Sequence, residues 1–77
     1  MRRVLQPVRV TTKKGYPVRI EWDGRRQPVT QVGDMWVRQG RWWGDEERRI
    51  HFRVETPSGA LELYRSGDSW VVTRVCD

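Results

Sequence analysis

The first candidates for acid–base or nucleophilic chemistry in this sequence of 77 residues are its one histidine, His51, and its one cysteine, Cys76. A histidine acts as a general base only when an oriented nucleophile lies within hydrogen-bond reach, and no motif around His51 supplies one. A cysteine becomes a nucleophile only when a neighbouring group lowers its pKa. We therefore expect a solvated strand histidine, a small apolar filler at Cys76, no catalytic residue and no enzyme activity.

The acidic run at residues 45–47 is the one candidate for a cation site. Its three acids follow one another without the spacing of a calcium loop, so a solvated turn, or ion pairs with the arginines that follow, is the simpler interpretation. A zinc site would need more ligands than Cys76 and His51 provide. We expect no metal, no cofactor and no small-molecule substrate.

Arginine and tryptophan are the residues that point to binding. The net charge is +5, and it divides into +7 over residues 1–41 and −2 over residues 42–77. Thirteen of the fifteen bases are arginine, whose guanidinium group forks onto phosphates and carboxylates and stacks on aromatic rings. A polyanion or an acidic protein surface is therefore a reasonable partner, and a merely solvated basic surface is the alternative.

Five tryptophans cannot all be buried in so small a core, and adjacent Trp42 and Trp43 on an extended chain point to opposite faces. Exposed rings flanked by arginine suit single-stranded nucleic acid, and they also form the anchors of protein interfaces. A third interpretation is that the arginines only cover tryptophan faces within the chain. The predicted binding surface consists of Arg9, Arg19, Arg25, Arg26, Arg38, Arg41, Trp42 and Trp43.

Short segments in which polar and apolar residues alternate must position these side chains. From Arg49 to Glu55 polar and apolar residues alternate, which predicts a central strand with Ile50, Phe52 and Val54 on its inner face. Further strands are expected over residues 6–12, 16–22, 27–32, 35–38, 60–65 and 69–77, the last with Trp70, Val72 and Cys76 on one face.

Glycine-containing turns separate these segments. Asp23-Gly24 predicts a tight hairpin because both residues tolerate positive φ. Further turns are expected at residues 13–15, 33–34, 57–59 and 67–68, and a short helical turn between residues 39 and 47. Pro7 lacks an N–H for a ladder, which favours an edge position for the first strand.

The pattern as a whole predicts a single all-β domain over residues 1–77, a small antiparallel meander of six or seven short strands curling into a half-open barrel. Residues 1–6 are expected to form a loosely ordered start. No apolar run approaches the roughly 20 residues of a membrane span, and the start lacks the apolar stretch of a signal peptide. The lone thiol fits a reducing compartment, so we expect a cytoplasmic protein.

From Trp42 onward the chain resembles a known family. The segments that carry the resemblance are Trp42-Trp43, the strand from Arg48 to Val54, Leu61 to Arg65, Trp70 and Val75-Cys76-Asp77. They resemble the small C-terminal domain, of uncharacterised function, of ImuB proteins, which are inactive relatives of Y-family DNA polymerases in the bacterial mutasome. Residues 17–25 and 35–37 resemble the first half of the same domain. Family members usually carry an aromatic residue where this chain has Cys76.

The resemblance implies a bacterial setting near DNA-damage tolerance, without a known ligand. The leading expectation is a non-catalytic interaction module that docks onto a protein of DNA-damage tolerance or replication. The alternative is direct binding of single-stranded DNA or RNA through the basic first half. The chain is expected to be a monomer or a weak homodimer.

Overall fold

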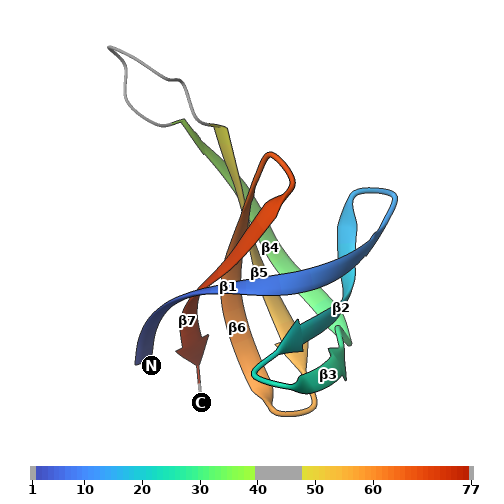
Figure 1. Ribbon diagram of the computed structural model, residues 1–77. Helices are drawn as coiled ribbons and strands as arrows, with labels where there is room; N and C mark the ends of the chain where they lie inside the picture. Colours follow the sequence, from blue (N-terminus) through green and yellow to red (C-terminus); the bar gives the residue numbers. More distant parts are fainter. Residues whose placement is uncertain (1, 40–47, 77) are drawn as a thin grey trace.

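Seven antiparallel strands form one curled sheet in the computed structural model, which describes residues 2–39 and 48–76 (Figure 1). The order of the strands across the sheet is β3-β2-β1-β7-β6-β5-β4. Their bounds are β1 Arg2–Lys13, β2 Tyr16–Trp22, β3 Arg25–Pro28, β4 Gln31–Gln39, β5 Arg48–Thr56, β6 Gly59–Ser66 and β7 Ser69–Cys76. The predicted all-β meander, curled into a half-open barrel, is confirmed.

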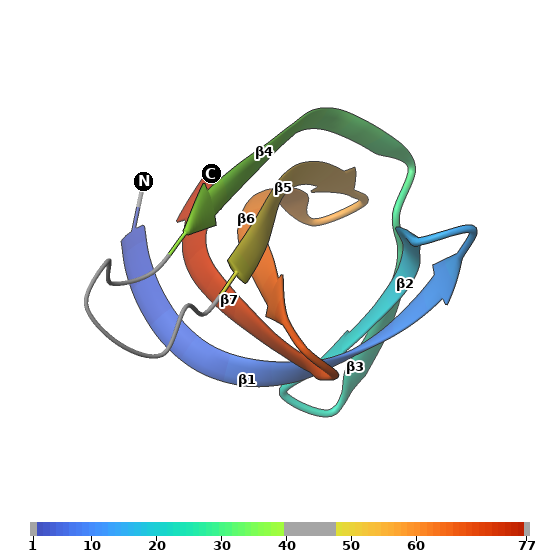
Figure 2. The ribbon, with the colours of Figure 1, turned by 90° about the horizontal axis from the view of Figure 1, so that it is seen from above.

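The two end strands of the sheet, β3 and β4, are successive parts of one chain segment. Between them, the Val29 N–H donates to the carbonyl of Val18 on β2, with 3.0 Å between nitrogen and oxygen. The next N–H, of Thr30, donates to the carbonyl of Glu55 on β5 at 2.8 Å. This link therefore ties both ends of the sheet together, and the strands curl around a common centre when seen from above (Figure 2).

The core lies inside this curl and is built from alternate residues of the strands. Phe52 is 2% exposed and its ring lies 5.5 Å from that of Trp70, centroid to centroid. The other buried apolar residues are Ile20, Val54, Leu61, Leu63 and Val72. Phe52 and Val54 on β5 are buried while Arg53 is exposed, which confirms the predicted faces of that strand.

The hairpin turns have the backbone that their residue types require. Asp23 and Gly24 have φ values of 56° and 75°, so the predicted tight hairpin between β2 and β3 is confirmed. Lys14 and Gly15 adopt the same left-handed conformation between β1 and β2, with φ values of 54° and 85°. The turns that set the register of the β1–β2 and β2–β3 pairs therefore lie where the sequence predicts them.

The first strand begins earlier than predicted and changes its pairing partner along its length. β1 already begins at Arg2, which is paired with Val75 of β7, so the start of the chain from Arg2 onward is not loose. In the strand order β1 lies between β2 and β7, but residues 2–8 pair with β7 alone and residues 9–13 pair with β2 alone. Pro7 therefore lies on a stretch of β1 with one neighbouring strand, as its missing N–H favours.

Two further irregularities move residues from their predicted places. Gly33 and Asp34 lie within β4, where the register shifts, rather than forming a turn. A shift on β6–β7 places Val75 opposite Leu61 on the inner face and Cys76 opposite Ala60, which reverses the prediction for Cys76. One extra residue in a strand moves the following side chains to the other face, and an alternating pattern does not reveal it.

β5, predicted as the central strand, lies one place from the edge, and β7 is in the middle. The predicted helical turn at residues 39–47 falls almost wholly outside the described residues. No helix in the described part of the chain has the length and apolar character needed to cross a membrane.

Candidate functional site

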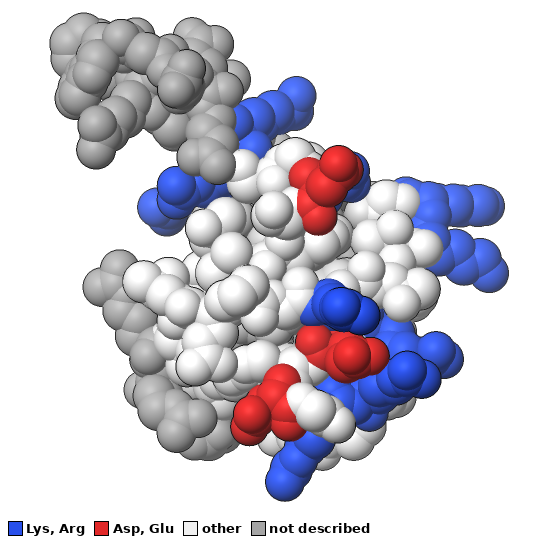
Figure 3. All heavy atoms as spheres, in the orientation of Figure 1, with Lys and Arg blue, Asp and Glu red and all other residues white. Residues whose placement is uncertain are grey.

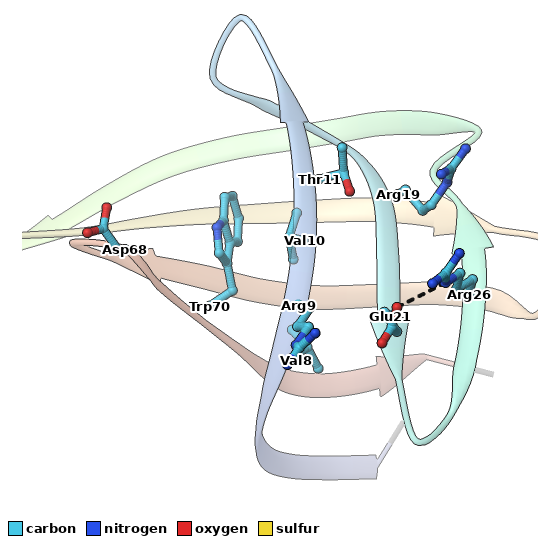
Figure 4. Close-up of a pocket in the computed structure, with 9 residues that line it drawn as sticks. All are labelled: Val8, Arg9, Val10, Thr11, Arg19, Glu21, Arg26, Asp68 and Trp70. Atoms are coloured by element: carbon cyan, nitrogen blue, oxygen red, sulfur yellow. Dashed lines mark hydrogen bonds and ion pairs between the residues drawn. The ribbon is translucent and has the colours of Figure 1, made fainter.

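The structure divides the predicted binding residues among separate surfaces. Arg9, Arg19 and Arg26 come together around a hollow of about 590 Å³ over β1 and β2 (Figure 4). Arg25 lines a different hollow, together with Leu5. Arg38 is on β4, the last strand in the order of the sheet, and lines another groove. The remaining predicted residues, Arg41, Trp42 and Trp43, lie outside the described residues.

The hollow at Arg9, Arg19 and Arg26 is basic but partly neutralised. Glu21 lies opposite Arg9 on β1 and opposite Arg26 on β3, and the Arg26 Nε donates to the Glu21 carboxylate at 3.0 Å. Asp68 from the β6–β7 turn adds a second acid. Lysine and arginine side chains also gather over the β1–β2 hairpin and over β2 and β3 (Figure 3). This side of the barrel therefore offers positive charge in general.

Among the described residues, the basic hollow has no exposed aromatic ring for stacking. The aromatic residue that lines it in this part of the chain, Trp70, is 7% exposed, and its ring packs against Phe52 in the core. Phosphate groups could contact such a surface, but a base would find no ring face there. Rings suited to stacking lie instead on the outer face of β4, β5 and β6.

A row of three rings crosses the outer face of β4, β5 and β6. The register places Trp36 opposite His51 and His51 opposite Tyr64. The Trp36 and His51 rings are stacked, with centroids 5.3 Å apart and 12° between their planes. The Tyr64 ring is tilted by 42° to that of His51, with centroids 5.4 Å apart. We call Trp36, His51, Tyr64 and the arginines described next the aromatic face.

Arginines border the row of rings on both sides. On one side Arg38 lies directly opposite Arg49, whose guanidinium carbon is 4.9 Å from the centroid of the Tyr64 ring. On the other side a row of alternating charge crosses four strands; it consists of Asp34, Arg53, Glu62 and Arg74. A shallow groove of about 230 Å³ runs over this area and is lined by all three rings.

The alternation of β5 explains why these groups share one surface. Because Phe52 faces the core, its neighbours His51 and Arg53 face outward, and the paired residues of β4 and β6 follow the same side. Since β4 is the last strand of the sheet, the Trp36 ring has His51 on one face and points its other face toward an edge that no described strand covers.

The surroundings of His51 favour the neutral imidazole. Partial burial lowers the pKa of His51, and the positive charges of Arg38 and Arg49 lower it further, while Glu62 acts in the opposite direction. The Nε2 atom is buried without a hydrogen-bond partner, which leaves an imidazolium proton unsatisfied. At neutral pH the ring therefore serves as a stacking partner between Trp36 and Tyr64.

A metal-binding cluster is absent from residues 2–39 and 48–76. In that part of the chain no three His, Cys, Asp or Glu side chains lie close enough together to hold a metal ion. Cys76 is partly buried at the end of β7, away from the His51 row by register. The chemistry that the aromatic face can support is stacking and charge pairing.

Sequence reasoning missed Trp36, His51 and Tyr64 as one site. It placed His51 on the outer face of its strand, but the register that aligns this residue with Trp36 and Tyr64 was needed to see the row. The available signal was the presence of aromatic residues at positions where the alternation calls for polar ones.

Comparison of the chain with family models, curated proteins and solved structures gave no match. The resemblance to the ImuB C-terminal domain therefore stays a prediction.

Proposed function

We propose that the chain is a non-catalytic module that binds single-stranded nucleic acid on its aromatic face. The observation that carries the proposal is the cross-strand row of Trp36, His51 and Tyr64, bordered by Arg38 and Arg49. Single-stranded binding needs a ring on which a base can stack and a cation beside it for the phosphate. The aromatic face combines both on one outer surface.

Each group has a separate part in this function. The Trp36 ring face that points away from His51 accepts a base, a contact that contributes about 1–3 kcal/mol in known single-strand binders. Arg38 follows two residues later on the same side of β4 and contacts the phosphate. His51 and Tyr64 hold the Trp36 ring upright, because each ring packs on the next.

An unpaired strand suits this surface better than a duplex. Bases in a duplex are stacked on one another and present only their edges in the grooves. A row of rings on a sheet is useful when bases are splayed out of a stack, which single strands and loops allow. Because every base has a ring face, we expect affinity with little dependence on sequence.

Docking onto a protein is the second candidate function, and it is the one that the sequence favoured. Its specific support is a set of exposed apolar side chains on β1 and β2: Leu5, Tyr16 and Val18. Exposed apolar residues of this kind are common anchors of protein interfaces. A bacterial setting close to DNA-damage tolerance belongs to both proposals and is supported by the resemblance to the ImuB domain, while a cytoplasmic location is supported by the lone thiol.

Fluorescence anisotropy with a labelled single-stranded oligonucleotide, at low salt and over a salt series, tests the proposed function. We expect log affinity to fall linearly with log salt, and Arg38→Gln to lower the slope by about one, as the loss of one phosphate contact requires. Arg25→Gln is the matched control, an exposed arginine on β3, and should leave the slope unchanged. Failure to bind at low salt would reject nucleic-acid binding and leave protein docking.

A further inference from the structure

The outer edge of β4 carries backbone groups that no described strand pairs with, because β4 is the last strand of the sheet. Natural proteins protect such edges with short strands, proline, lysine or bulges. The opposite end strand, β3, has this protection: it has four residues and ends in Pro28. β4 has nine residues without proline or lysine, and its one irregularity lies at its start, between Val32 and Asp34.

The segment beyond that irregularity, Asp34–Gln39, has features of a pairing strand. Met35 and Val37 lie opposite Phe52 and Ile50 of β5 and so face the inner side of the sheet, yet they are 52% and 45% exposed. Exposed apolar residues on the inner side of an open edge form a surface that another strand would bury. A regular strand with free backbone groups and an uncovered apolar side is the usual template for strand addition.

The segment carries one acidic and one basic residue, so two copies of it that run antiparallel can pair opposite charges. Asp34 and Arg38 lie on the outer side of β4, two residues before and two residues after Trp36. Neither makes an ion pair with another described residue. On the β5 side Arg38 lies opposite Arg49, which carries the same sign of charge.

We propose that the Asp34–Gln39 edge of β4 pairs antiparallel with the same edge of a second copy of the chain, around a two-fold axis at Trp36. In this register Asp34 lies opposite the partner's Arg38, and Met35 lies opposite the partner's Val37. Trp36 lies opposite the partner's Trp36. The Asp34–Arg38 and Met35–Val37 pairs each occur twice, as an isologous interface requires, and the single Trp36 pair lies on the axis. Both apolar residues stay on the inner face of the joined sheet.

The charges select this register among the alternatives. A shift of one residue would bring inner residues opposite outer ones, which the pleat forbids. Moving the axis to Met35 or Val37 keeps the faces but removes the pairing of Asp34 with the partner's Arg38. Only the axis at Trp36 combines two ion pairs, two apolar pairs and one aromatic pair.

This self-pairing is separate from the proposed nucleic-acid binding and is tested without nucleic acid. The two share the Trp36 ring face that points toward the free edge, so each ring serves one of them at a time. Nucleic-acid binding can be measured at protein concentrations far below those at which weak dimers form. Failure of one proposal therefore leaves the result for the other unaffected.

Sedimentation equilibrium of the full chain, from about 10 µM to about 1 mM, covers the range in which weak complexes dissociate. We expect a monomer–dimer equilibrium for the wild-type chain. Asp34→Arg and Arg38→Asp should each weaken it by about tenfold or more, because each places two like-charge pairs in the interface. Arg25→Asp on the other end strand is the matched charge reversal and should leave the equilibrium unchanged.

The decisive arm is an equal mixture of the Asp34→Arg and Arg38→Asp variants. In a mixed dimer both charge pairs are again opposite in sign, so dimers should return although neither variant forms them alone. Circular dichroism melts confirm that both variants are folded, as expected for substitutions at exposed positions. A monomeric wild-type chain across the range, single variants that dimerise like wild type, or a mixture that stays monomeric would each overturn the proposal.

Discussion

The indole ring of Trp36 lies nearly parallel to the imidazole of His51 across the β4–β5 pair, with 5.3 Å between ring centroids and 12° between ring planes. One face of the indole is therefore fixed against His51, and the other is turned to the open edge of the sheet. We expect Trp36→Ala to weaken binding of a single-stranded oligonucleotide by about 1–3 kcal/mol, with the salt slope unchanged because no charge is lost.

Tyr16→Ala is the matched control for this substitution. Tyr16 is also an exposed aromatic residue, but it lies on β2, outside the aromatic face. Anisotropy titrations at the same low salt give the affinity of each variant for the oligonucleotide, and the two affinities are then compared. Equal losses of affinity in the two variants would mean that Trp36 has no special part in binding.

Substitutions at neighbouring positions of β5 test the inner and outer faces of the barrel. Phe52 is buried against Trp70, so Phe52→Ala should lower the free energy of unfolding by about 3–5 kcal/mol, enough to unfold much of a domain of this size. Arg53 is exposed and lies 3.8 Å from Glu62, so Arg53→Ala should cost at most about 1 kcal/mol. If thermal melts showed Arg53→Ala to be less stable than Phe52→Ala, the assignment of the inner and outer faces of β5 would be wrong.

The fold could be predicted to a large extent because strand alternation and turn chemistry are local properties. The alternation of residues 49–55 identifies Phe52 as a core residue, and Asp23-Gly24 identifies the hairpin from the φ values that it needs. The order of the strands is not local. Pairing of β1 with β7 joins the two ends of the chain, and no short pattern encodes it.

The candidate site could be predicted only in part, for the same reason. The sequence indicated arginine and tryptophan as binding residues, and Arg9, Arg19 and Arg26 do come together. The alignment of Trp36 with His51 and Tyr64 depends on the register of two strand pairs. A register irregularity precedes Asp34 on β4, so counting residues along the sequence does not give that alignment.

The β2–β3 turn provides a test of backbone strain without packing effects. Gly24 has a φ of 75°, and a Cβ atom added there would meet nothing within 4 Å. Gly24→Val should therefore lower stability by about 1–3 kcal/mol through the strained backbone alone. Gly33→Ala is the control, since the added Cβ would make only an ordinary contact of 3.6 Å with the Arg53 carbonyl. An unchanged melting temperature for Gly24→Val would remove the turn assignment.

The lowered pKa of His51 predicts a pH dependence of stability. Because the folded chain binds the proton less readily than the unfolded chain, whose histidine pKa is 6.5, unfolding is favoured by protonation. The stability is therefore fully present above pH 6.5 and declines as the pH falls through 6.5 toward the lowered value. His51→Gln should show a smaller decline in melting temperature over this window, and an identical decline would contradict the assignment.

The most direct test of the central claim is a titration of the isotope-labelled chain with a short single-stranded oligonucleotide, followed by amide chemical shifts. We predict that the largest shifts fall on the aromatic face, at residues 34–38 of β4, 49–53 of β5 and 62–64 of β6, and that the indole N–H signal of Trp36 moves with them. Shifts centred instead on Arg9, Arg19 and Arg26, or no shifts at low salt, would contradict it.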